Sequence, residues 1–115
     1  MISGIIIYAT GEVEFITMGV QPPYPGFKRD TPFYSDDIFT IYNSELHIDN
    51  LSFNYCSCMD VFNNVANSFI NILKQTENII YNIYGDVYIF KMDERNNFIT
   101  FNSDELKHII NTITG

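Results

Sequence analysis

Positive charge is what this sequence lacks most. It has 6 Lys plus Arg against 14 Asp plus Glu, and its formal net charge is −8 over 115 residues. Codon drift does not explain the shortage, because the chain is rich in Ile, Asn, Tyr and Phe, and AT-rich codons also supply Lys freely. Among the six bases only Lys28 and Arg29 are adjacent, so no basic patch exists to neutralise phosphates. The composition therefore excludes a nucleic-acid partner and favours a basic protein, which the acidic field attracts.

Long hydrophobic runs and cysteines are also scarce. The longest apolar run, Gly4 to Ala9, is far too short to span a bilayer. No basic segment precedes it, so we expect a buried strand rather than a secretory signal, and no membrane association. Cys56 and Cys58 would point to opposite faces of a strand and would not easily join each other in a disulfide. Free thiols in a chain without a signal indicate a cytoplasmic protein.

Proline is confined to a single stretch. All four prolines lie within residues 19–35, most of them in the run Pro22-Pro23-Tyr24-Pro25. Proline removes a backbone donor and fixes φ, so this stretch is predicted to be a loop with some polyproline character. A connection of this length is often functional. Its tyrosine either packs down on the domain or helps to bind a partner.

The residues that are present predict one folded domain over residues 1–115. With 46% hydrophobic and 16% aromatic content, the chain is too apolar to be disordered. Ile5–Tyr8 and Glu12–Met18 flank the turn Thr10-Gly11 and predict an opening hairpin. From Asp37 to Cys56 we expect a β-meander with turns at Asn43-Ser44 and Asp49-Asn50. The alternative is one long strand over 38–48 followed by a single hairpin.

Two helices and three further strands follow. Apolar residues at helical spacing predict a main helix over 57–77, with Ser57 as its N-cap. Asn102 and Glu105 have the spacing of a capping box and predict a C-terminal helix over 103–114. Strands are expected over 79–83, 86–92 and 98–101, and the second is apolar on both faces and therefore central. The predicted fold is an α+β single domain: a largely antiparallel twisted sheet of about six to seven strands, packed by one long helix and the C-terminal helix.

Acid–base chemistry has one candidate site. Glu45, His47 and Asp49 alternate along a strand, and Ser52 and Asn54 are their expected cross-strand neighbours. A histidine beside a carboxylate is a possible general base, so a small hydrolase using His47 with Glu45 or Asp49 is one hypothesis. No G-x-S-x-G nucleophile elbow accompanies it. The solvated face of a sheet supplies the same polar mixture without catalysis, so we predict that the protein is not an enzyme.

No metal or cofactor is expected. Cys56, Cys58, His47 and His108 are numerous enough to bind zinc, but their spacing is wrong for zinc fingers and ribbons. Carboxylate pairs occur at Glu12/Glu14, Asp36-Asp37 and Asp93-Glu94. They lack the phosphate loop or the EF-hand spacing that Mg²⁺ or Ca²⁺ sites use.

What remains is an acidic module that binds a basic protein. Acidic residues beside exposed tyrosines combine electrostatic steering with aromatic anchors, as binding surfaces do. The residues predicted to contact the partner are Asp36, Asp37, Glu45, Asp49, Glu12, Glu14, Tyr24 and Tyr42.

In size, charge and α+β texture, the whole chain resembles the immunity proteins of bacterial toxin systems such as contact-dependent growth inhibition. The resemblance implies a cytoplasmic inhibitor that occludes the active site of a cognate toxin domain, often a basic nuclease encoded beside it. Its carboxylates would take the place of substrate phosphates. The alternative is a phage-type acidic inhibitor or DNA mimic that blocks a host nuclease.

Overall fold

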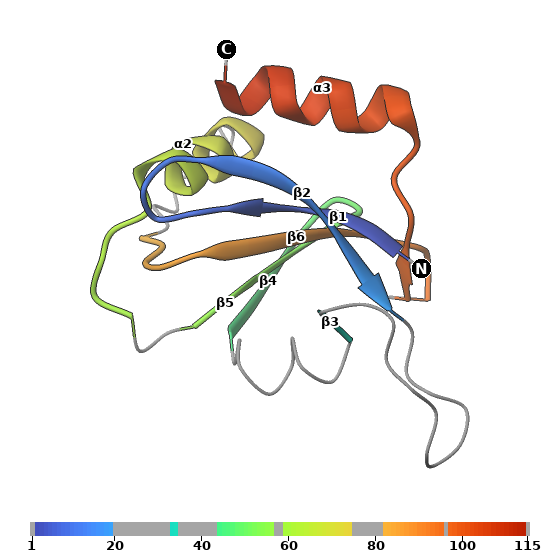
Figure 1. The fold of residues 1–115 in the computed structure, drawn as a ribbon, viewed down its shortest axis with the longest axis horizontal. Helices are drawn as coiled ribbons and strands as arrows, with labels where there is room; N and C mark the ends of the chain where they lie inside the picture. The colour runs from blue at the N-terminus through green and yellow to red at the C-terminus, as the bar shows by residue number, and fades with distance from the viewer. Residues whose placement is uncertain are drawn as a thin grey trace.

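The computed structural model describes residues 2–19, 33–34, 44–56, 59–74, 82–95 and 97–114. These residues form a twisted, largely antiparallel sheet and two helices that lie on the same side of it (Figure 1), which confirms the α+β class. The elements are β1 (Ile2–Ile7), β2 (Val13–Gly19), β3 (Phe33–Tyr34), β4 (Ser44–Ile48), β5 (Leu51–Tyr55), α2 (Asn64–Leu73), β6 (Val87–Met92), β7 (Phe98–Ile99) and α3 (Ser103–Thr114).

The strand order of the sheet is β3-β2-β1-β6-β5-β4. All neighbours are antiparallel except β2 and β3, which pair in parallel over two residues. β7 pairs with the last two residues of β6. β6 thus lies between β1 and β5, as its apolar residues on both faces predict. β1 is central for the same reason, since Ile5, Ile6 and Ile7 are all buried.

The strand registers place five residues in one row across the sheet. Glu14 of β2 lies opposite Ile6, Ile6 opposite Tyr88, Tyr88 opposite Asn54, and Asn54 opposite Glu45 of β4. All five side chains project from the face that the helices do not cover, because opposed residues share a face. At about 4.8 Å per strand, the backbones of Glu14 and Glu45 are about 19 Å apart.

The core occupies both faces of the central strands. On the helix-covered face, residues of β1, β5 and β6 pack against α2 and α3, and the rings of Phe53 and Phe69 lie 6.0 Å apart. The opposite face holds a smaller cluster of Ile6, Tyr88 and Phe90, with Phe98 stacked on Phe90 at 5.1 Å.

The main helix is shorter than predicted. A helix over 57–77 was expected, but α2 spans only Asn64–Leu73, and the described residues before it are not helical. Phe62 forms a β-bridge with Tyr84, and the Asn63 side chain caps the helix by accepting from Ala66 N at 3.0 Å. Pairing with a segment far along the chain therefore displaces the first helical turns. Residues 57–58 and 75–77 lie outside the described residues.

The remaining predictions have mixed outcomes. α3 spans Ser103–Thr114, and its capping box forms: Glu105 N donates to Asn102 Oδ1 at 2.8 Å, and Asn102 N donates to Glu105 Oε1 at 3.1 Å. Of the strand expected over 79–83, only residues 82–83 are described, and neither is in a strand. Of the proline-rich loop over 19–35, the structure describes residues 19, 33 and 34, which belong to β2 and β3. The choice between a meander and a long strand before Ser44 lies outside the described residues.

Candidate functional site

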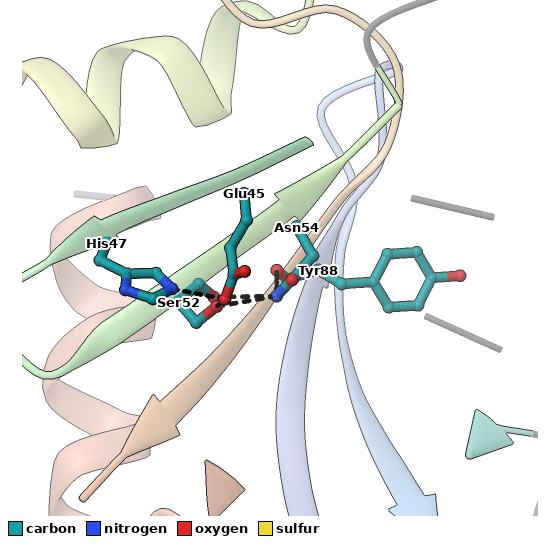
Figure 2. Close-up of polar contacts among 5 residues, drawn as sticks. All are labelled: Glu45, His47, Ser52, Asn54 and Tyr88. Carbon is teal, nitrogen blue, oxygen red and sulfur yellow. Dashed lines mark hydrogen bonds and ion pairs between the residues drawn. The ribbon is translucent and has the colours of Figure 1, made fainter. Parts of the chain in front are cut away.

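Glu45 and His47 form a hydrogen-bonded network with Ser52 and Asn54 on the face of β4 and β5 that the helices do not cover (Figure 2). Glu45 is its centre: its Oε1 contacts His47 Nε2 and accepts a hydrogen bond from Ser52 Oγ at 2.9 Å. Asn54 Nδ2 donates to Ser52 Oγ at 3.2 Å and contacts the Tyr88 carbonyl at 3.4 Å. Alternation along each strand explains this arrangement, because residues two apart share a face.

The network is closed on one side and exposed on the other. Ser52 is fully buried and Asn54 is 1% exposed, whereas the side chains of His47 and Glu45 are 42% and 36% exposed. The buried serine hydroxyl donates its hydrogen bond to Glu45 rather than to the histidine, so it is neither activated by an imidazole nor open to a substrate. The Asn54 Oδ1 atom is buried without a hydrogen-bond partner. The arrangement therefore clamps β4 to β5, and only His47 and Glu45 face solvent.

Asp49 does not join this network. It lies in the turn between β4 and β5, where it is exposed and has a positive φ of 54°. Two-residue hairpin turns require such left-handed conformations, and Asp adopts them more readily than most residues. The structure therefore pairs His47 with Glu45 and leaves Asp49 at the end of the sheet.

Three carboxylates gather around Tyr8 at the end of the β1–β2 hairpin. The Tyr8 hydroxyl donates to Glu14 Oε2 at 2.8 Å, and Asp86 Oδ1 accepts from Ala9 N at 2.9 Å. The hydrogen bond to Glu14 raises the pKa of Tyr8, and desolvation and the negative charges of Glu14, Asp86 and Glu12 raise it further. Within the described ranges, no lysine or arginine pairs with these carboxylates. We call Glu12, Glu14 and Asp86 the hairpin-end carboxylates.

The predicted partner-binding residues do not form one cluster within the described part of the chain. Glu12 and Glu14 belong to the hairpin-end carboxylates, and Glu45 lies in the row of Glu14 but on β4, on the other side of the central strands β1 and β6. Asp49 lies at the opposite end of the strands, in a depression of about 700 Å³ lined by Asp49, Asn50, Met92, Asp93, Glu94 and Arg95. Asp36, Asp37, Tyr24 and Tyr42 lie outside the described residues.

Sequence reasoning missed an exposed apolar surface. Met59, Phe62 and Tyr84 are 46%, 40% and 40% exposed, and we call them the aromatic surface. The Phe62 and Tyr84 rings meet edge to face, with centroids 5.6 Å apart at 71°. Met59 and Phe62 fell within the helix predicted over 57–77, and no local signal marks the bridge that Phe62 makes with Tyr84 instead. Asp86 was also missed, since it approaches Tyr8 only through the fold.

The aromatic surface adjoins the hairpin-end carboxylates. The buried Asn63 amide donates to the carbonyls of Ile7 and Gly85 at 2.9 and 2.8 Å, which joins the end of β1 to the bridge segment. Gly85 has φ +76°, and a Cβ there would lie 2.7 Å from Met59 Cγ, so the thioether packs directly on the glycine. Asp86 follows Gly85 in the chain. The segment that carries the aromatic surface therefore runs beside the end of β1, from which Tyr8 and the hairpin turn continue.

A second concave region lies between the helices. This groove of about 510 Å³ has an apolar floor, and polar residues from the β4–β5 turn and α3 form its rim. It is lined by Asp49, Asn50, Leu51, Phe69, Ile72, Leu73, Phe101, Glu105, His108, Ile109 and Thr112. Because Asp49 and Asn50 also line the acidic depression, the two hollows adjoin each other.

In the described ranges, no three His, Cys, Asp or Glu side chains come together as a metal site would require. No helix in the same ranges has the length and apolar character needed to cross a membrane. Cys56 is half-buried at the end of β5, and Cys58 lies outside the described residues. No family model, curated protein or solved structure matches the chain.

Proposed function

We propose that the protein is an inhibitor that binds a basic protein domain and occludes its active site, as an immunity protein does to its cognate toxin. The observation that supports this most directly is the group of hairpin-end carboxylates, Glu12, Glu14 and Asp86. They lie around Tyr8 without a basic neighbour among the described residues. Like charges held this close repel one another, and a cationic partner relieves that repulsion.

The mechanism follows from the charge. An acidic surface steers a basic partner and raises its association rate toward about 10⁸–10⁹ M⁻¹s⁻¹ at low salt. Once bound, the carboxylates occupy the positions that substrate phosphates take in a nuclease, and the body of the sheet blocks access. In this proposal the inhibitor performs no chemistry, and the Glu45–His47–Ser52–Asn54 network serves to hold β4 on β5.

One observation supports a second candidate function, a small hydrolase. His47 and Glu45 contact each other at an exposed position, as a general base and the carboxylate that orients it would. The buried hydroxyl of Ser52 is closed to substrate, so such an enzyme would have to activate water directly. A hydrolase would lose activity when His47 is replaced by Ala, whereas an inhibitor would keep its binding.

Co-expression with the product of the adjacent reading frame tests the proposal. We expect the protein to protect cells from that product and to form a complex whose dissociation constant rises with salt concentration. His47→Ala is expected to protect as well as the wild type. Failure to bind or protect would exclude the immunity role. Binding to a host nuclease instead would identify the DNA-mimic alternative.

A further inference from the structure

We infer that the aromatic surface and the hairpin-end carboxylates together form the docking surface, and that they receive an arginine-bearing segment of the partner. This inference rests on the proposed function and assigns it a place on the molecule. It joins two observations: exposed apolar side chains around the Phe62–Tyr84 ring contact, and carboxylates on the neighbouring segments that no described base neutralises. Aromatic and acidic groups side by side match the mixed character of arginine.

The surface is held in place before any partner arrives. Gly85 N donates to the Val61 carbonyl at 2.7 Å, and Asn63 N donates to the Ile83 carbonyl at 2.9 Å. These bonds flank the Phe62–Tyr84 bridge, and the Asn63 side chain ties the same segment to β1. Little backbone freedom is left to lose on binding, which lowers the entropic cost of association.

Arginine fits this surface better than lysine does. A guanidinium stacks on an aromatic face and at the same time donates two hydrogen bonds to a carboxylate. Phe62 and Tyr84 are each 40% exposed, and Asp86 lies two residues after Tyr84. The hydrogen bond from Ala9 N to Oδ1 orients the Asp86 carboxylate. A lysine ammonium is a point charge and cannot make the planar, two-pronged contact.

The two hollows described above fit a basic segment less well. In the depression beside Asp49, the Asp93 carboxylate already accepts from Arg95 N at 2.8 Å and Asn97 N at 3.0 Å, and these bonds lower its pKa. Arg95 also places a positive charge there. In the groove between α2 and α3, Glu105 is paired with Lys91 at 2.6 Å. The hairpin-end carboxylates lack a basic neighbour of this kind among the described residues.

Titration with a short peptide of alternating arginine and glycine, followed by amide chemical shifts, tests the inference. We expect the shifts to concentrate at residues 8–14, 59–63 and 84–86. The lysine counterpart should bind about 2- to 30-fold more weakly, since a stacked cation adds roughly that factor. Shifts centred on Asp49 and Glu94, or equal binding of the two peptides, would overturn the inference.

Matched variants separate the contributions of rings and charges. Phe62→Leu with Tyr84→Leu keeps the apolar bulk and removes the π faces, so it should abolish the preference for arginine while leaving the fold intact. Asp86→Asn should weaken both peptides, whereas the control pair Asp49→Asn and Glu94→Gln should bind as the wild type does. An unchanged arginine preference in the leucine pair contradicts the inference.

The same variants distinguish this inference from the proposed function. If the neighbouring gene product binds but the leucine pair and Asp86→Asn do not weaken it, the docking surface is wrong and the function stands. If the arginine peptide binds here but the neighbouring gene product does not bind, the surface is correct and the immunity role is wrong.

Discussion

Asn63 connects three parts of the molecule through one fully buried amide. Its Nδ2 donates to the carbonyls of Ile7 and Gly85, and its Oδ1 accepts from Ala66 N at the start of α2. The side chain thereby ends the bridge segment, begins the helix and fixes both to β1. Few other residue types offer two donors and an acceptor on so short a stem.

Replacing Asn63 by Ala should therefore be costly. The variant loses the helix cap and leaves two buried carbonyls without a donor, so we expect the free energy of unfolding to fall by about 2–4 kcal/mol. Urea denaturation measures the change. Asn64→Ala, at an exposed position of the first helical turn, is the control and should lie within about 0.5 kcal/mol of the wild type. A loss below that limit for Asn63→Ala would show that the three bonds matter little.

A second residue-scale prediction concerns pH. The hydrogen bond from Lys91, together with one from the Asn102 backbone, lowers the pKa of Glu105. A carboxyl whose folded pKa lies below its unfolded value stabilises the protein above the unfolded value of about 4.3, and that stability is lost as pH falls through the folded pKa. Both side chains are partly exposed, so the pair contributes only about 0.5–1 kcal/mol.

Comparison of Glu105→Gln with the wild type tests the direction of this pH dependence of stability. The wild type should be more stable at neutral pH, and the two free energies of unfolding should converge as the pH falls through the lowered pKa of Glu105, because both side chains are neutral below it. Asp104→Asn, one residue earlier and exposed, serves as the control for general charge effects. A gap between Glu105→Gln and the wild type that persists in acid would assign the effect to packing.

At the scale of elements, the sequence was a good guide wherever the deciding contacts are local. The β1–β2 hairpin, the turn at Asp49-Asn50 and the capping box of α3 all depend on residues within a few positions of one another. The predicted start of α2 was wrong because the contact that sets it joins residues far apart in the sequence. Phe62 pairs with Tyr84, and no helix periodicity encodes that bridge.

In the candidate site, too, the sequence predicted the local contacts and missed the distant ones. Alternation along β4 and β5 correctly placed Glu45, His47, Ser52 and Asn54 on one face, since only a short hairpin is involved. Strand order is not visible in such a pattern. The sequence therefore does not predict that Glu14 and Glu45 lie on opposite sides of the central strands. Nor does it predict that Asp86 lies near Tyr8.

Gly4 on β1 leaves room for the Phe90 ring of the neighbouring strand β6. A Cβ at this position would lie 2.5 Å from Phe90 Cε1 and 2.8 Å from the Ile89 carbonyl oxygen, so the phenyl ring occupies the space that a side chain would need. We expect Gly4→Ala to lower the free energy of unfolding by about 1–3 kcal/mol, as overpacking does. Adding Phe90→Leu should recover part of the loss in a double-mutant cycle. Strictly additive effects of the two changes would contradict this packing.

Charge is the dominant property of the whole molecule. With a net charge of −8, the folded chain repels itself, and added salt screens that repulsion. We expect the free energy of unfolding to rise by roughly 0.5–1 kcal/mol as salt increases from about 0.01 to 0.15 M, because each like-charge contact costs a few tenths of a kcal/mol. Asp86→Asn, which removes one hairpin-end charge, should show a smaller rise. A stability that falls with salt would mean that ion pairs outweigh the repulsion.

The central place of β1 has a consequence for synthesis on the ribosome. Ile5 pairs with Ile89, so β1 waits for a partner made 84 residues later, which at about 5–20 residues per second takes about 4 to 17 s. During that interval the β1–β2 hairpin presents an open edge carrying Ile5, Ile6 and Ile7, the kind of edge that recruits other chains. Glu12 and Glu14 lie on the same hairpin and emerge with it. Charges placed on such a hairpin act as gatekeepers that keep nascent chains apart, whatever they contact in the finished protein.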